Sequence, residues 1–212
     1  MNPGNRATGG ATAPTAAQDA ADMPAALRRA FAADIERWGR VRNLTAAVAR
    51  SVPTWQATVR AEHMYVSLTR LDAATQAVLC VYTSMLNGCA YCVDDAAAVA
   101  LDEQVTAAQL RTLATPFAAF DARVVAGLEY ARWVVLAPSA IPPEVVGTLR
   151  RYVDDEELLE LTAVVAMKCF WNRFVSALGI PPEGRCADPD LIRDLCRLGA
   201  VLRAGGDPTR PV

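Results

Sequence analysis

The stretch NGCAYCVDD, residues 87–95, holds the residues most able to do chemistry. Cys89 and Cys92 are three positions apart, and Asp94 and Asp95 follow almost at once. Residues i and i+3 of a helix are neighbours, so two cysteines at this spacing can close into a disulfide. The stretch therefore predicts a redox dithiol with Cys89 and Cys92 as its catalytic pair.

Two features of the surroundings have opposite effects on whether the thiols ionise. In the first turn of a helix, unpaired N–H groups and the helix dipole would favour the thiolate of Cys89, the form that attacks. Asp95 lies three positions after Cys92, on the same helix face, and its carboxylate would oppose that second negative charge. Asp95 is also a candidate substitute base; the alternative is an ordinary charge near a helix N-terminus. A structural or vestigial cysteine pair is the alternative for Cys89 and Cys92.

A metal site is the weaker interpretation of this motif. Structural zinc needs about four ligands, whereas the chain has no second CxxC and a single histidine, His63. We expect neither a metal nor a cofactor. Cys80 and Cys169 lie in apolar stretches and are expected to pack in the core. Cys186 and Cys196 flank the start of the last expected helix, as free thiols or as a second disulfide.

Composition limits the classes of function. The chain has 212 residues, 53% of them hydrophobic, and a net charge of −2 with a pI of about 5.5. Nothing in this balance favours a nucleic acid or an anionic membrane as partner. The N-terminus lacks the order of a signal peptide, and no stretch provides about 18 uninterrupted apolar residues. We expect a cytoplasmic protein without a membrane segment.

Helical patterns run through most of the chain. Residues 1–22 are expected to be disordered, 23–205 to form a single helical domain, and 206–212 to be a loose tail. The expected helices span about 24–39, 53–70, 72–87, the CxxC onward, 106–109, 118–137, 144–152, 156–178 and 189–204. The first of them should present one apolar face made of Leu27, Phe31, Ile35 and Trp38. Strand-type alternation is absent, so the predicted fold class is all-α.

Two apolar stretches of equal length suggest a unit used twice. AVLCVYTSMLNGC, residues 77–89, and ELTAVVAMKCFWN, residues 160–172, each end in a polar or small segment and continue into further helix. Only the first stretch contains the cysteine pair. The sequence thus suggests a degenerate internal repeat.

Three segments together resemble the alkylhydroperoxidase D-like / carboxymuconolactone decarboxylase family. They are LTRLDAATQAVLCVYTSMLNGCAYC, TAAQLRTL and VDDEELLELTAVVAMKCFWNRFVSALGIPPEG, within about residues 40–185. The resemblance implies an all-helical fold that assembles as a homo-oligomer, a trimer or a hexamer. It also implies a Glu-x11-Cys-x2-Cys-x3-His pattern, which redox members use to reduce peroxides or to relay disulfides.

The chain departs from that pattern at two positions. Ala77 stands where the family glutamate would fall, and Ala96 where the histidine would fall. Both members of the expected proton relay are therefore replaced. Glu160 lies twelve positions before Asn172, but nothing in the sequence shows that it reaches the thiols.

The leading hypothesis is a thiol-dependent peroxidase that reduces hydroperoxides in antioxidant defence. By the resemblance, Cys92 attacks the peroxide, Cys89 resolves the sulfenic acid, and an external dithiol recycles the pair; the two roles could be exchanged. One alternative is a lactone decarboxylase or related lyase, for which Asp94, Asp95 and His63 are the loose acid–base candidates. The other is a non-catalytic helical oligomer that has lost the relay.

Overall fold

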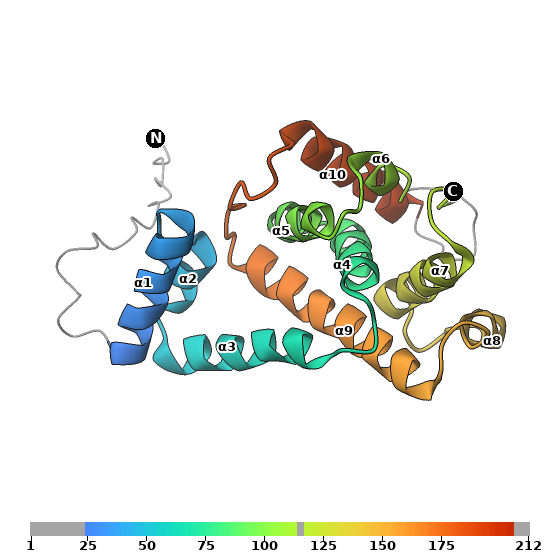
Figure 1. The fold of residues 1–212 in the computed structure, drawn as a ribbon, viewed down its shortest axis with the longest axis horizontal. Helices are drawn as coiled ribbons and strands as arrows, with labels where there is room; N and C mark the ends of the chain where they lie inside the picture. The colour runs from blue at the N-terminus through green and yellow to red at the C-terminus, as the bar shows by residue number, and fades with distance from the viewer. Residues whose placement is uncertain (1–23, 114–116, 206–212) are drawn as a thin grey trace, which may run out of the picture. The chain divides into compact units, whose positions relative to one another are not determined.

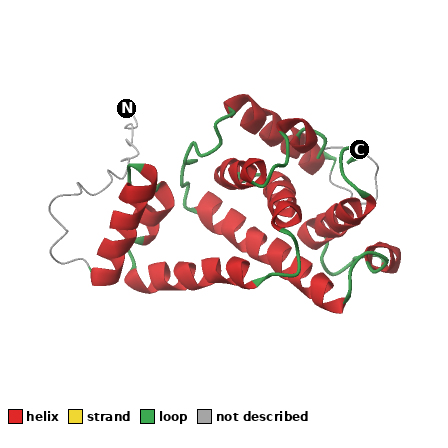
Figure 2. Ribbon diagram, in the orientation of Figure 1, coloured by secondary structure: helices red, strands yellow, loops and turns green. Residues whose placement is uncertain are grey.

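The structure is a computed structural model that describes residues 24–113 and 117–205. Figure 2 shows helices joined by loops, and no strand occurs within these two ranges. The all-α fold predicted from the sequence is confirmed. In chain order the helices are α1 Ala25–Trp38, α2 Asn43–Val48, α3 Val52–Ser67, α4 Ala73–Asn87, α5 Ala90–Asp102, α6 Ala107–Leu110, α7 Ala122–Leu136, α8 Pro143–Leu149, α9 Asp155–Ala177 and α10 Pro189–Ala204.

The chain divides into two compact units, with the boundary after Gln56. The expected disordered segment 1–22 and the tail 206–212 lie outside the described residues. The expectation of one domain over 23–205 stays a prediction.

In the first unit, the predicted apolar face of α1 is only partly buried. Leu27 is buried, but Ile35 and Trp38 remain 54% and 36% exposed. The helix instead buries Asp34, whose carboxylate accepts hydrogen bonds from the backbone and side-chain nitrogens of Arg42 at 3.0 and 2.8 Å. This contact and the short helix α2 were not predicted from the sequence, because neither has a strong periodic pattern.

In the second unit, α4 is the central helix, packed against α5, α7, α9 and α10 (Figure 1). Every residue of α4 from Ala77 to Leu86 is buried, so this helix is covered on all sides. The cysteine pair follows this helix directly and is therefore placed by the core. Side chains with no exposed surface include Leu79, Val81, Tyr82, Leu110, Leu113, Leu128, Leu149, Val164, Val165, Leu191 and Leu195.

Most helices of the second unit begin where the sequence places an N-cap. The carboxylates of Asp72, Asp121, Asp154 and Asp188 each accept a hydrogen bond from the backbone N–H three residues later. Thr106 and Gln109 form a capping box at the start of α6. These boundaries could be predicted because a cap depends only on neighbours in sequence.

The contact between α4 and α10 requires glycine. A Cβ built on Gly199 would lie 2.6 Å from the carbonyl oxygen of Met85, closer than real Cβ atoms approach. Arg203, one turn later, donates a hydrogen bond to the same carbonyl oxygen. The last helix therefore packs directly on the backbone that leads into the cysteine motif.

The predicted internal repeat stays a prediction. The helix α4 ends at Asn87 before α5 begins, whereas α9 continues without interruption to Ala177.

Candidate active site

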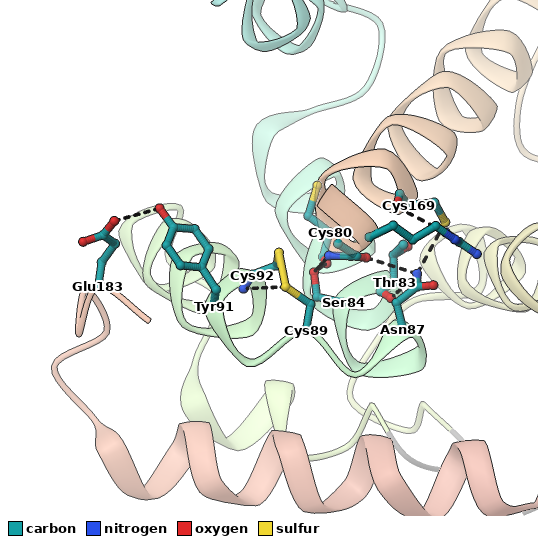
Figure 3. The surroundings of a disulfide bond; sticks show 11 residues. Cys80, Thr83, Ser84, Asn87, Cys89, Tyr91, Cys92, Cys169 and Glu183 are labelled. Carbon is teal, nitrogen blue, oxygen red and sulfur yellow. Dashed lines mark hydrogen bonds between the residues drawn. A yellow bond between two sulfur atoms is a disulfide. The ribbon is translucent and has the colours of Figure 1, made fainter. Parts of the chain in front are cut away.

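Cys89 and Cys92 are joined in a disulfide at the start of α5, with their Cα atoms 5.3 Å apart. Gly88 ends α4 in the left-handed conformation, at φ 71°, and thereby turns the chain into α5. The N–H of Cys89 donates to the carbonyl oxygen of Ser84 at 3.1 Å. Both cysteines are buried, with 1% and 2% of their surface exposed. Figure 3 shows the bond between the end of α4 and the start of α5.

Cys89 is the N-cap residue of α5. Its sulfur accepts a hydrogen bond from the backbone N–H of Cys92 at 3.3 Å. A sulfur at this position faces unpaired N–H groups and the positive end of the helix dipole. In the reduced protein these groups would stabilise a thiolate on Cys89 more directly than one on Cys92.

A buried polar cluster lies beside the pair, between α4 and α9. The Asn172 side-chain amide donates to the Ser84 hydroxyl at 3.1 Å and accepts from Asn87 at 3.1 Å. Ser84 in turn donates to the carbonyl oxygen of Cys80 at 2.7 Å. Asn172 therefore fixes the last turn of α4, from which Cys89 follows.

The loop before α10 is attached to the outer side of α5. Asp94 is buried, and its carboxylate accepts from the backbone N–H groups of Arg185 and Cys186 at 3.0 and 2.9 Å. The Tyr91 hydroxyl donates to Glu183 at 3.0 Å, and Figure 3 shows this side chain turned away from the polar cluster. This attachment was not predicted from the sequence, because its partners are about ninety residues apart.

A cavity of about 490 Å³ lies between α3, α4, α5 and α9. It includes Ala96, one helical turn after Cys92. The lining residues are Tyr65, Leu68, Leu71, Ala73, Gln76, Ala77, Cys80, Asp95, Ala96, Val99 and Lys168.

Comparison with known proteins gives a consistent result. The family model described as the carboxymuconolactone decarboxylase family matches residues 52–133, which contain the cysteine motif. The alkylhydroperoxidase AhpD core of a peroxidase-related protein from Ralstonia eutropha superposes with a TM-score of 0.67 at 20% identity, over 81% of this chain and 90% of that one. Residues 52–133 therefore resemble the carboxymuconolactone decarboxylase family, and the likeness to the solved structure concerns the fold.

Two further relatives lie within the same range of similarity. The uncharacterised protein YdfG of Bacillus subtilis is 26% identical over 120 residues, which are 54% of this chain and 80% of YdfG. The debrominase Bmp8, solved in complex with 2,3,4-tribromopyrrole, has a TM-score of 0.66 at 18% identity, over 84% of this chain and 94% of that one. At this identity the likeness to Bmp8 concerns the fold alone.

The two departures from the family pattern meet at one place. Ala77 on α4 and Ala96 on α5 both line the cavity, although they are nineteen positions apart. Where the resemblance implies a glutamate and a histidine, this chain has two methyl groups and open space.

Asp95 lines the same cavity and is paired with a cation. Its carboxylate lies 2.8 Å from the guanidinium of Arg185, which also reaches Asp102 at 3.8 Å. Its assignment as a catalytic base stays a prediction. The pairing does reduce the electrostatic opposition that the sequence led us to expect from the aspartates, because Asp94 and Asp95 both face donors.

The remaining candidates lie elsewhere. His63 is exposed on α3 and does not line the cavity. Glu160 accepts from the backbone N–H groups of Thr69 and Arg70 at 3.3 and 2.8 Å, so it holds the turn before α4. Cys186 and Cys196 are free thiols here, as are Cys80 and Cys169.

Two kinds of feature are absent from the described residues. None of the helices in these ranges is both long and apolar enough to span a membrane. In the same residues, no group of three or more His, Cys, Asp or Glu side chains is arranged to hold a metal ion.

Proposed function

We propose that this protein is a thiol-dependent peroxidase that reduces hydroperoxides through Cys89 and Cys92. The observation that carries the proposal is the disulfide at the N-terminus of α5, with Cys89 as N-cap. A pair at this position can alternate between dithiol and disulfide without any change in the helices that hold it. An external dithiol as reductant, an oligomeric assembly (trimer or hexamer) and a cytoplasmic location belong to the same proposal.

The proposed reaction is balanced in three steps. The Cys92 thiolate attacks one peroxide oxygen, so that an S–O bond forms, the O–O bond breaks, and the alkoxide leaves as an alcohol after taking a proton. The Cys89 thiolate then attacks the Cys92 sulfur, so that the disulfide forms, the S–O bond breaks, and the displaced hydroxide takes up a proton to become water. A small-molecule or protein dithiol returns two electrons and two protons and becomes a disulfide itself.

The groups around the cysteine pair favour a negative charge on sulfur, which supports this chemistry. The Cys92 N–H and the helix dipole favour negative charge on Cys89, and the two neighbouring aspartates are occupied by the 185–186 backbone and by Arg185. Asp95 is the proposed base, since it lies one turn beyond Cys92 and lines the same cavity as Ala96.

The test is hydroperoxide consumption with dithiothreitol as the electron donor. The wild type should consume cumene hydroperoxide, and Cys89→Ser and Cys92→Ser should each fall to the uncatalysed rate, because either change prevents disulfide formation. Cys196→Ser, on α10 away from the pair, is the control and should keep the wild-type rate. Equal rates for the wild type and both site variants would exclude the proposal.

A non-catalytic family member is the second candidate. It is favoured by the two alanines in the cavity and by the burial of both sulfurs. If it is correct, the wild type consumes no peroxide, and the double variant Ala77→Glu with Ala96→His gains activity. Turnover by the wild type removes this candidate. For the lyase alternative, Asp94 is engaged with the loop, Asp95 is paired with Arg185 and His63 is exposed, so these three candidates form no acid–base pair with one another in the described structure.

A further inference from the structure

Lys168 is the only lysine of the chain, and it is buried in the wall of the cavity. Its exposed fraction is 8%, and no hydrogen bond or ion pair joins it to any residue that the structure describes. The ammonium lines the cavity and is not among the fully enclosed side-chain atoms that lack a hydrogen-bond partner. A cation in this position, without an ion pair inside the described chain, is available to an anionic group that enters the cavity.

The other polar groups of the cavity do not compensate this charge. The Asp95 carboxylate is already paired with Arg185 at 2.8 Å. Burial raises the pKa of the Cys80 thiol and the charge of Lys168 only opposes that rise, so Cys80 is neutral near pH 7. Among the residues that line the cavity, Lys168 is thus the one cation, and the one carboxylate, that of Asp95, is held by Arg185.

Tyr65 adds an unused hydrogen-bonding group. Its hydroxyl is buried in the cavity wall and has no hydrogen-bond partner among the described residues. Burial keeps the phenol protonated, because it raises the pKa of Tyr65 far above the ordinary value. A protonated phenol can donate to an anionic oxygen held by Lys168.

Apart from Gln76, the rest of the wall is apolar. Leu68, Leu71, Ala77, Ala96 and Val99 line it, and the volume lies within the range of sites for small organic molecules. A bare inorganic anion would leave these groups without contact. A ligand with an apolar body and a single anionic head fits both parts.

We propose that this cavity binds a small organic acid, with its anionic head on Lys168 and the Tyr65 hydroxyl and its apolar body in the space beside Ala77 and Ala96. The site goes beyond the proposed peroxidase activity, because binding requires neither Cys89 nor Cys92. It uses the space that the two alanines leave open.

The test is isothermal titration calorimetry of the full chain with benzoate. The matched probes are benzamide, which has the same shape without charge, and inorganic phosphate, which has charge without an apolar body. Benzoate should bind saturably, and both probes should bind at least about tenfold more weakly, because each lacks one of the two contacts. Benzamide or phosphate binding as tightly as benzoate would overturn the proposal.

Two variants locate the site. Lys168→Met should weaken benzoate binding at least about thirtyfold, whereas Arg173→Met, on the exposed side of the same helix, should leave it unchanged. Ala77→Leu keeps the ammonium but fills the cavity and should also abolish binding. Urea unfolding of each variant shows that it is folded.

The outcomes separate this proposal from the peroxidase. The double variant Cys89→Ser with Cys92→Ser should bind benzoate like the wild type, even if no form of the protein consumes peroxide. A wild type that does not bind benzoate, or a folded Lys168→Met variant that binds it equally well, would overturn the site whatever the peroxidase result.

Discussion

Asp94 shows how a single buried carboxylate ties the cysteine helix to a distant part of the chain. It accepts two backbone N–H groups of the loop before α10 and has only 3% of its surface exposed. Asp95, the next residue, makes a side-chain ion pair with Arg185 instead and is less buried. Adjacent aspartates of the same motif therefore have different roles, and the difference can be measured.

Asp94→Asn should lower the free energy of unfolding by about 2 kcal/mol, because the amide presents a donor to one of two backbone N–H groups that need acceptors. Asp95→Asn should cost less than about 1 kcal/mol, since its ion pair is partly exposed to solvent. Urea unfolding of both variants gives the comparison. Equal losses would show that Asp94 does not anchor the loop.

At this scale the sequence predicted what is local. The three-residue spacing of Cys89 and Cys92 predicted their proximity, and the position of Asp95 predicted a place near them. The contacts of Asp94 and the burial of Lys168 depend on segments that come together only in the folded chain. No local pattern could have indicated them.

At the scale of elements, the close contact between α4 and α10 fixes the end of α4, from which the chain enters the cysteine motif. The backbone of α10 at Gly199 lies against Met85, near the end of α4, and Arg203 donates to the same carbonyl. The sequence predicted both helices. It did not predict their contact, because a glycine inside a helix lowers helix propensity whether or not another helix lies against it.

Gly199→Ala should destabilise the protein by about 1–3 kcal/mol, because the new methyl group would overlap backbone atoms of Met85 that cannot rotate away. Gly147→Ala is the matched control: it also lies in a helix, α8, but its Cβ would meet nothing within 4 Å. That control should gain about 0.5 kcal/mol from helix propensity. Thermal unfolding of the two variants distinguishes them by sign, and a stabilised Gly199→Ala would contradict the close packing.

Asp72 connects the start of α4 to the acid stability of the protein. Partial burial raises the pKa of its carboxyl, but the hydrogen bonds from Thr75 and the charge of Arg123 outweigh this and hold the pKa below the ordinary value. Because the pKa of this carboxyl is lower in the folded protein than in the unfolded chain, Asp72 stabilises the folded protein at pH values above the unfolded-state pKa. This stabilisation is lost as the pH falls through the folded-state pKa.

Asp72→Ala should therefore cost about 1 kcal/mol at neutral pH, and the gap to the wild type should narrow as the pH falls below about 4. Urea unfolding across that range measures the gap. Asp72→Asn, which keeps a capping oxygen, is the control and should lose less at neutral pH. A gap that stays constant with pH would show that the charge of Asp72 contributes nothing.

At the scale of the whole molecule, the core contains ionisable groups that are buried as neutral species. Tyr82 has no exposed surface, its hydroxyl has no hydrogen-bond partner among the described residues, and its ring meets that of Phe117 edge to face at 5.4 Å. Burial raises the pKa of Tyr82, and it also raises the pKa of the Cys80 thiol. The family resemblance predicted the fold that buries them, but not their protonation states, which depend on the finished core.

These shifts predict a loss of stability in alkali. A group whose pKa is raised by folding contributes fully to the free energy of unfolding at pH values below its unfolded-state pKa, which is about 8.5 for cysteine and 10 for tyrosine. This contribution is lost as the pH rises toward the folded-state pKa. The free energy of unfolding should thus fall between about pH 8 and pH 11, and the fall should be smaller in Tyr82→Phe, which cannot ionise there.

Tyr82→Phe should also be as stable as the wild type or up to about 1 kcal/mol more stable at neutral pH, because it removes a buried hydroxyl that bonds to nothing. Tyr130→Phe is the matched control in the same core: its hydroxyl lies 2.9 Å from that of Thr162, so its loss should cost about 1 kcal/mol. Urea unfolding at neutral and alkaline pH separates the two tyrosines. If Tyr82→Phe is destabilised as much as Tyr130→Phe and keeps the full alkaline loss, then the Tyr82 hydroxyl is hydrogen-bonded in solution, and the core is not closed around it as this structure shows.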